Sequence, residues 1–114
     1  MADNVSKDIQ DKALEAIELA RTTGKIKKGT NEVTKAIEKG LAKLVVCATD
    51  VSPPEITMHL PLLCKDKGVP CVVAGKREEL GASAGLEVGT VSIAIIKEGE
   101  SKKLIKEISD SLTA

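Results

Sequence analysis

The chain has 114 residues, of which 42% are hydrophobic and 30% charged, and its 17 basic residues balance its 17 acidic ones. This composition is typical of one globular domain, and the zero net charge alone gives no reason to expect a nucleic-acid partner. Phe, Tyr and Trp are all absent, which excludes the aromatic platforms that stack RNA bases and the aromatic cages that hold cations. We therefore expect a single domain over residues 1–114 with an aliphatic core.

The first half of the chain predicts two helices and two strands. Apolar residues three and four apart predict a helix over residues 6–23 that ends at Gly24. A short extended segment at 25–28 precedes a second helix, which has Thr30 as its N-cap and ends at Gly40. The run L-V-V-C-A at 44–48 predicts a strand that is buried on both faces.

The second half continues the alternation of helices and strands. A turn at 50–54 leads into a helix that runs towards residue 67, and Pro61 is expected to break or restart it. The remaining predicted elements are a strand at 71–74, a helix at 77–84, a loop at 86–90, a strand at 91–96 and a helix at 101–112. This order predicts an α/β fold, a three-layer α/β/α sandwich with a central mixed four-stranded sheet.

The charges and the cysteines add two expectations. Residues 1–20 hold two Lys against five acids, a net of −3, whereas residues 24–43 hold six Lys against two Glu, a net of +4. Such a basic segment creates a local positive potential that the net charge of the whole chain does not reveal. The three cysteines (Cys47, Cys64 and Cys71) lie in apolar runs without a C-x-x-C pattern, which indicates reduced, buried thiols in a cytoplasmic protein. The polar N-terminus predicts neither a signal peptide nor a membrane span.

No residue makes a strong case for catalysis or for a metal. Asp50 follows a buried strand, where ligands bind in open α/β sheets, but a phosphoacceptor site needs further acids and the first extended segment offers Lys27 and Lys28 instead. A turn or helix-capping aspartate is the favoured interpretation. His59 is the only histidine and has no evident second ligand or nucleophile. We expect no enzyme activity, no metal and no cofactor.

The segment from Lys25 to Lys43 is the most informative part of the chain. Gly29 permits a tight entry into a helix, whose free N–H groups bind anions, with lysines nearby. Asn31 and Lys35 are four residues apart and share a helix face with Glu32 beside them. An amide, a carboxylate and an ammonium group together are able to read base edges. From the residues alone, a site that reads RNA bases and a capped helix with a solvent-exposed polar face are equally supported.

The segment from Gly85 to Val91 carries apolar side chains between glycines. An exposed aliphatic loop is unusual unless something covers it. It is either a packed crossover loop or a surface on which an unstacked base rests.

These segments resemble a known family. The chain is similar to the archaeal large-subunit ribosomal proteins of the L-seven-Ae type, which bind kink-turn RNA. The resemblance is clearest from Thr22 to Glu98. It is carried by K-K-G-T-N-E-V-T-K at 27–35, K-G-L-A-K-L-V at 39–45, A-T-D-V-S-P-P-E-I at 48–56, H-L-P-L-L-C at 59–64, G-V-P at 68–70 and L-G-A-S-A-G at 80–85.

The resemblance implies the α/β/α sandwich and a role for particular residues. The start of the second helix approaches phosphate, while Asn31, Glu32 and Lys35 read tandem sheared G·A pairs. Arg77 adds a backbone contact, Ile56 lies near the RNA, and the apolar loop packs against an extruded nucleotide. The implied RNA-binding residues are Lys27, Lys28, Gly29, Thr30, Asn31, Glu32, Lys35, Ile56, Arg77, Leu86, Glu87, Val88 and Val91.

The implied partners are ribosomal RNA, box C/D and H/ACA guide RNA, RNase P RNA and other guide-particle proteins, with the free protein monomeric. Three residues depart from the family pattern: Ser52 replaces an acid, Ala82 an arginine and Gly89 a proline. Two alternatives stay open. One is a paralogous RNA binder of the L-thirty-e type, and the other is a small α/β anion-binding domain that uses Asp50 and the helix start at Thr30.

Overall fold

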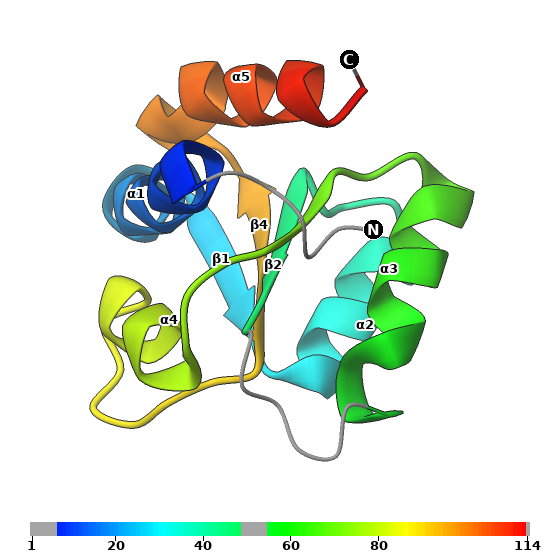
Figure 1. Ribbon diagram of the computed structural model, residues 1–114, viewed down its shortest axis with the longest axis horizontal. Coiled ribbons are helices and arrows are strands. Elements are labelled where there is room, and N and C mark those ends of the chain that lie inside the picture. The colour runs from blue at the N-terminus through cyan, green and yellow to red at the C-terminus, as the bar shows by residue number, and fades with distance from the viewer. Residues whose placement is uncertain (1–6, 49–54, 114) are drawn as a thin grey trace.

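The computed structural model describes residues 7–48 and 55–113, and it has the α/β architecture that the sequence predicts (Figure 1). Its elements, in chain order, are α1 (Lys7–Thr23), β1 (Lys25–Lys28), α2 (Thr30–Glu38), β2 (Leu44–Cys47), α3 (Glu55–Lys67), β3 (Cys71–Val73), α4 (Arg77–Ser83), β4 (Ser92–Lys97), a 3-10 turn (Gly99–Ser101) and α5 (Lys102–Thr113). In this part of the chain, no helix combines the length and the apolar character needed to cross a membrane.

The four strands form one mixed sheet in the order β1-β4-β2-β3. The last strand of the chain, β4, lies inside the sheet and runs antiparallel to both β1 and β2, whereas β2 and β3 are parallel. All four residues of β2 are buried. This burial on both faces explains why β2 is a continuous apolar run instead of an alternating one.

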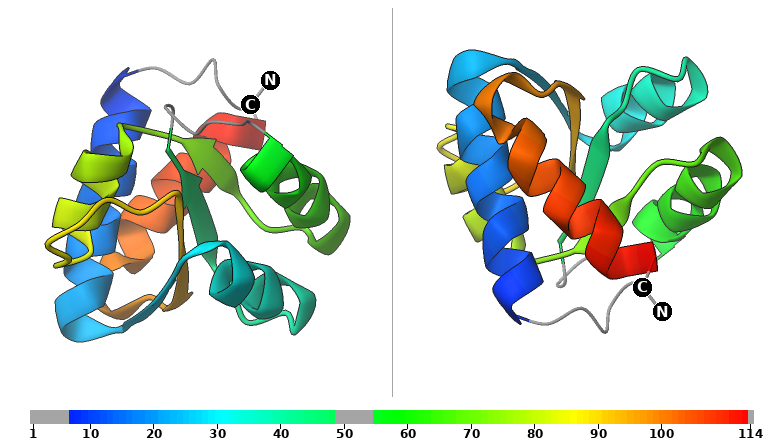
Figure 2. Two further views of the ribbon diagram at one scale, coloured as in Figure 1. Left: turned by 90° about the horizontal axis from the view of Figure 1, so that it is seen from below. Right: turned by 90° about the horizontal axis from the view of Figure 1, so that it is seen from above.

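Helices cover both faces of the sheet and complete the three layers (Figures 1 and 2). Leu44 and Val46 of β2 face a core that α1, α4 and α5 close. Val45 and Cys47 face the opposite core, which α2 and α3 close. Successive side chains of a strand point to opposite faces, so one short strand supplies both cores.

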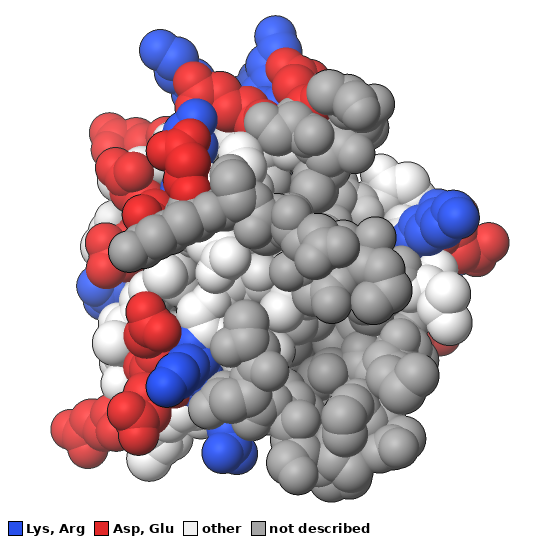
Figure 3. Space-filling view, in the orientation of Figure 1, with Lys and Arg blue, Asp and Glu red and all other residues white. Residues whose placement is uncertain are grey.

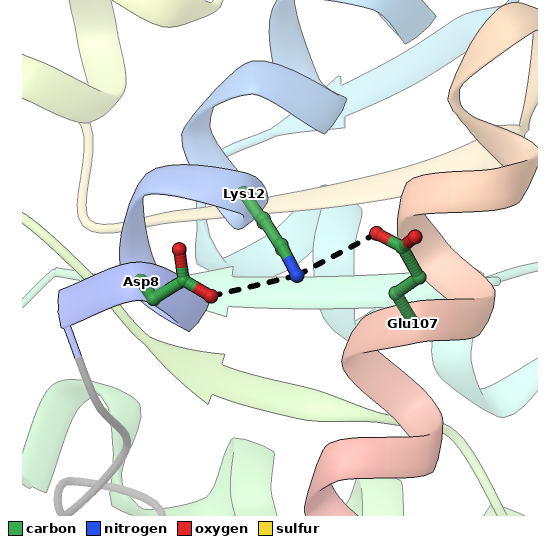
Figure 4. A network of polar contacts seen from close by, with 3 residues as sticks. All are labelled: Asp8, Lys12 and Glu107. Atoms are coloured by element: carbon green, nitrogen blue, oxygen red, sulfur yellow. Dashed lines mark ion pairs between the residues drawn. The ribbon is translucent and has the colours of Figure 1, made fainter.

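The contact between α1 and α5 carries a small polar network (Figure 4). Lys12 of α1 lies 3.5 Å from Asp8 of the same helix and 3.6 Å from Glu107 of α5. All three side chains are partly or largely exposed, so we expect this network to stabilise the fold by ~1 kcal/mol at most. The apolar residues Ile105 and Ile108 beneath it hold α5 in place.

Three local expectations from the sequence are wrong. The N-cap of α2 is Gly29, and Thr30 is the first helical residue, because the glycine takes a backbone conformation that threonine rarely adopts. Pro61 does not interrupt α3, which is one helix from Glu55 to Lys67. Cys71 is only partly buried, unlike Cys47 and Cys64, because β3 is an edge strand.

Several chain segments meet at one edge of the molecule, the lower edge in Figure 1. The end of β1, the starts of α2 and α3, and the loop that leads into β4 all lie along it, and the left view of Figure 2 looks onto it. The register agrees, since Lys28 at the end of β1 pairs with Ile93 near the start of β4. Segments from three parts of the sequence therefore share one surface.

Candidate nucleic-acid interface

The start of α2 is an open helix end. Gly29 has φ 89° and ψ 151°, and no side chain caps the helix. The first helical bond runs from the N–H of Val33 to the carbonyl of Gly29 over 2.9 Å. Within the described chain, the N–H groups of the three residues before Val33 have no acceptor, and they form a site that favours an anion.

The polar residues of the first two turns of α2 lie on its exposed side. Asn31, Glu32 and Lys35 are exposed, whereas Val33 and Ile37 are buried against the sheet. Because the buried residues fix the rotation of the helix, the three polar side chains are presented together. The structure thus brings together the residue types that the sequence singled out.

The two lysines at the end of β1 lie beside this helix start. Lys27 and Lys28 are exposed, and Gly29 extends the ladder by donating its N–H to the carbonyl of Ser92 over 3.0 Å. Lys27 Nζ lies 3.9 Å from Glu32 Oε2, a long ion pair that links β1 to α2. This link tends to hold Glu32 over the helix start.

The loop between α4 and β4 is anchored at both ends. The N–H of Leu86 donates to the carbonyl of Gly81 over 2.8 Å, and the N–H of Thr90 donates to the carbonyl of Arg77 over 3.1 Å. Leu86 is partly buried and packs against the core, whereas Val88 is 72% exposed. The loop is therefore packed at its root and leaves an aliphatic side chain open at its tip.

At two positions in this region, steric crowding favours glycine over a residue with a side chain. A Cβ on Gly81 would overlap the carbonyl oxygen of Val88, and a Cβ on Gly89 would lie 3.1 Å from the backbone of Arg77. Gly89 is thus in close contact with the start of α4. Ala82 is exposed.

The other predicted site residues have varied positions. Thr30 and Val91 are partly buried, whereas Glu87 and Arg77 are exposed. Ile56 and His59 belong to α3, but their side chains lie outside the described part, as do Asp50 and Ser52 altogether. Within the described residues, no three His, Cys, Asp or Glu side chains are grouped so that they could hold a metal ion.

A groove beside α2 was not predicted from the sequence. Its volume is about 100 Å³, and it is lined by Lys27, Glu32, Lys35, Ala36, Lys39, Leu41 and Ile96. The four-residue spacing of Lys35 and Lys39 is visible in the sequence. Their proximity to Ile96 depends on the position of β4 in the sheet, which the sequence pattern does not give.

Acidic side chains gather on another side of the molecule, over α1 and α4 (Figure 3). Asp11, Glu15 and Glu18 of α1 and Glu78 and Glu79 of α4 are exposed there. The lysines of the segment from β1 to the end of α2 are exposed as well.

Comparison with known proteins supplies the last observation. The sequence model of the ribosomal protein L7Ae/L30e/S12e/Gadd45 family matches residues 11–105. The fold is similar to that of a solved structure described as the Giardia lamblia 15.5kD RNA binding protein, with a TM-score of 0.89 and 33% sequence identity. The match covers 96% of this chain and 91% of that one.

Proposed function

Because this chain belongs to the ribosomal protein L7Ae/L30e/S12e/Gadd45 family, we propose that it is an RNA-binding protein that recognises and stabilises kink-turn RNA. The observation that carries the proposal is the open start of α2, where unpaired N–H groups lie beside three exposed polar side chains. The similar Giardia lamblia protein is itself described as RNA-binding.

Each group at the helix start has a distinct task in this proposal. The N–H groups that follow Gly29 and the ammonium groups of Lys27 and Lys28 hold a backbone phosphate. The Asn31 amide both donates and accepts, the Glu32 carboxylate accepts from guanine N–H groups, and Lys35 donates to guanine O6 or N7. Together these groups read the tandem sheared G·A pairs of the bend.

The loop before β4 covers the other side of the RNA. Val88, with Leu86, Glu87 and Val91 around it, packs against a nucleotide that the bend extrudes, and Arg77 contacts the backbone. Ile56, at the start of α3, is proposed to lie near the RNA as well. The chain has no aromatic residue to stack on a base, so aliphatic side chains pack against the nucleotide instead.

The proposed mechanism is a shift of populations without catalysis or cofactor. Free RNA samples open and bent states, and the protein binds the bent state, so the equilibrium moves by the difference between the two affinities. The proposed clients are ribosomal RNA, box C/D and H/ACA guide RNA and RNase P RNA, in cytoplasmic particles where other guide-particle proteins join a protein that is monomeric when free.

Titration of a short kink-turn RNA tests the proposal, beside a control RNA whose G·A pairs are replaced by Watson–Crick pairs. We expect tight binding to the first RNA only. Glu32→Ala and Lys35→Ala should each weaken binding by about 1–3 kcal/mol and leave the circular dichroism spectrum unchanged. Protein concentration has to come from amino-acid analysis, since the chain has no Trp or Tyr.

Three outcomes would contradict the proposal. Equal, salt-sensitive binding to both RNAs would mean that only a basic surface is present. Full affinity of both variants would remove Glu32 and Lys35 from the site. Binding of a free nucleotide without RNA binding would favour the alternative of a small anion-binding domain, which uses the same helix start.

A further inference from the structure

We infer that the groove beside α2 holds a phosphate and the adjoining ribose of the RNA strand that continues from the bend, so that Lys39 and Leu41 are RNA-contacting residues. This inference rests on the proposed function and extends it. It adds a backbone contact near the C-terminal end of α2, away from the groups proposed to read the bases.

The groove is continuous with the proposed base-reading site. Glu32 and Lys35 of that site line the groove together with Lys39 and Leu41. Since a helix rises 1.5 Å per residue, the Cα of Lys39 lies about 6 Å beyond that of Lys35 along the axis. A strand that follows α2 away from the helix start meets Lys39 next.

The charges in the groove favour an anion. Lys27 is partly compensated by Glu32 at 3.9 Å, but Lys35 and Lys39 form no ion pair with any residue in the described segments. Like charges four residues apart on a helix repel each other. A phosphate between the two ammonium groups relieves this repulsion, whereas a metal cation is disfavoured by three lysines.

The apolar part of the lining fits a sugar. Ala36 and Ile96 line the groove, and Leu41 beside them is 49% exposed. The helix dipole also favours a cation at the C-terminal end of α2. This explains the presence of Lys39 but not the exposed leucine beside it. The groove volume of about 100 Å³ is several times the ~10–15 Å³ that one water needs on the same measure, so the groove has room for a phosphate group.

Lys39→Gln tests the charge contact, with Lys103→Gln on α5 as the matched control. Both lysines are exposed, and both variants change the net charge equally. One phosphate contact contributes about 0.9 to the slope of log affinity against log salt, which at about 0.1 M salt equals roughly an eight-fold change in affinity. We expect Lys39→Gln to show both losses on the kink-turn RNA and Lys103→Gln to show neither.

Two further measurements locate the contact. A neutral methylphosphonate is placed at one backbone position at a time. We expect the modification at one position to weaken RNA binding by the wild-type protein and to leave binding by Lys39→Gln unchanged. Leu41→Ala is expected to weaken binding several-fold with an unchanged salt slope, because the lost contact carries no charge. Unfolding temperatures of the variants show that the fold is intact.

The outcomes separate this inference from the proposed function. If Lys39→Gln matches Lys103→Gln in affinity and slope while the wild type still prefers the kink-turn RNA, the groove is not an RNA contact but the proposed function stands. If the wild type shows no preference between kink-turn and control RNA, the proposed function fails first. Unchanged binding by Leu41→Ala would overturn the ribose contact.

Discussion

At Gly29, a single backbone conformation sets the geometry of the proposed interface. Its φ of 89° lies in a region that L side chains rarely adopt, and a Cβ built there meets no atom within 4 Å. A side chain at position 29 would therefore cause backbone strain but no collision within the protein. It would project into open space at the surface proposed to receive RNA.

Gly29→Ala and Gly68→Ala form a matched pair that tests this interpretation. Gly68 has φ 72°, also without a neighbour within 4 Å, and it follows α3. Each variant should lower the free energy of unfolding by about 1–3 kcal/mol, since both force alanine to a positive φ that L residues rarely adopt. Only Gly29→Ala should also weaken binding to kink-turn RNA. Equal RNA binding by the two variants, measured by titration, would contradict a role for Gly29 at the interface.

The sequence predicts some of these residues well. Asn31 and Lys35 fall on one exposed helix face because their spacing and the apolar residues between them define that face. The sequence misplaces the cap at Thr30, since threonine is an ordinary N-cap and the glycine before it carries no side chain to suggest one. The contact of Leu41 with the groove is not predictable from local pattern, because it needs Ile96, which is distant in sequence.

At the scale of elements, the alternation of helices and strands predicts the layers but not the strand order. Short apolar runs indicate buried strands, yet only the structure places β4 between β1 and β2. Pro61 shows the same limit. A proline inside a helix costs roughly 3 kcal/mol, but Leu60 and Cys64 on the same helix are buried against the sheet, and this packing keeps α3 continuous.

The three cysteines come from neighbouring elements. Cys71 of β3 affects the thiol of Cys64 of α3 and is itself affected by Cys47 of β2. The hydrogen bond to Cys71, together with burial, raises the pKa of the Cys64 thiol far above its ordinary value. The bond to Cys47 and burial likewise raise the pKa of Cys71. Both thiols therefore stay protonated in the folded protein.

This arrangement predicts a loss of stability in alkali. Below the ordinary thiol pKa of about 8.5, the folded and unfolded states are both protonated. Above it, the unfolded chain loses protons that the folded chain keeps, so the free energy of unfolding falls as pH rises, by up to ~1.4 kcal/mol per pH unit for each thiol. Urea unfolding from about pH 8 to pH 10 measures the fall.

The control for this titration is Cys71→Ala, which removes one raised thiol and the partner of the other. Its free energy of unfolding should fall less steeply over the same pH range. Parallel slopes for the two proteins would show that the thiols are not the cause.

At the scale of the whole molecule, the zero net charge conceals two separate surfaces. Acidic side chains are exposed on α1 and α4 (Figure 3), and the basic segment runs from β1 to the end of α2. At physiological salt, charges are screened over about 8 Å. We therefore expect the lysines of the basic segment to affect bound RNA more than the acids of α1 do.

A comparison of charge variants tests this locality. Glu15→Gln combined with Glu18→Gln raises the net charge by two on the acidic side, and we expect no change in affinity or salt slope. Lys28→Gln lowers the net charge by only one, and should reduce the slope by about 0.9 because a phosphate contact is lost. Tighter binding by the double variant, measured across a salt series, would show that the overall charge governs association.

The open start of α2 has a consequence for how folding and recognition are linked. The free protein leaves its first helical turn without a side-chain cap, and a glycine in place of a capping side chain commonly costs a few tenths of a kcal/mol. In the proposed complex, the RNA phosphate supplies that cap from outside the chain. Part of the measured affinity is then the free energy of capping the helix. A capping side chain supplied by the protein itself would stabilise the free protein and lower its affinity for RNA.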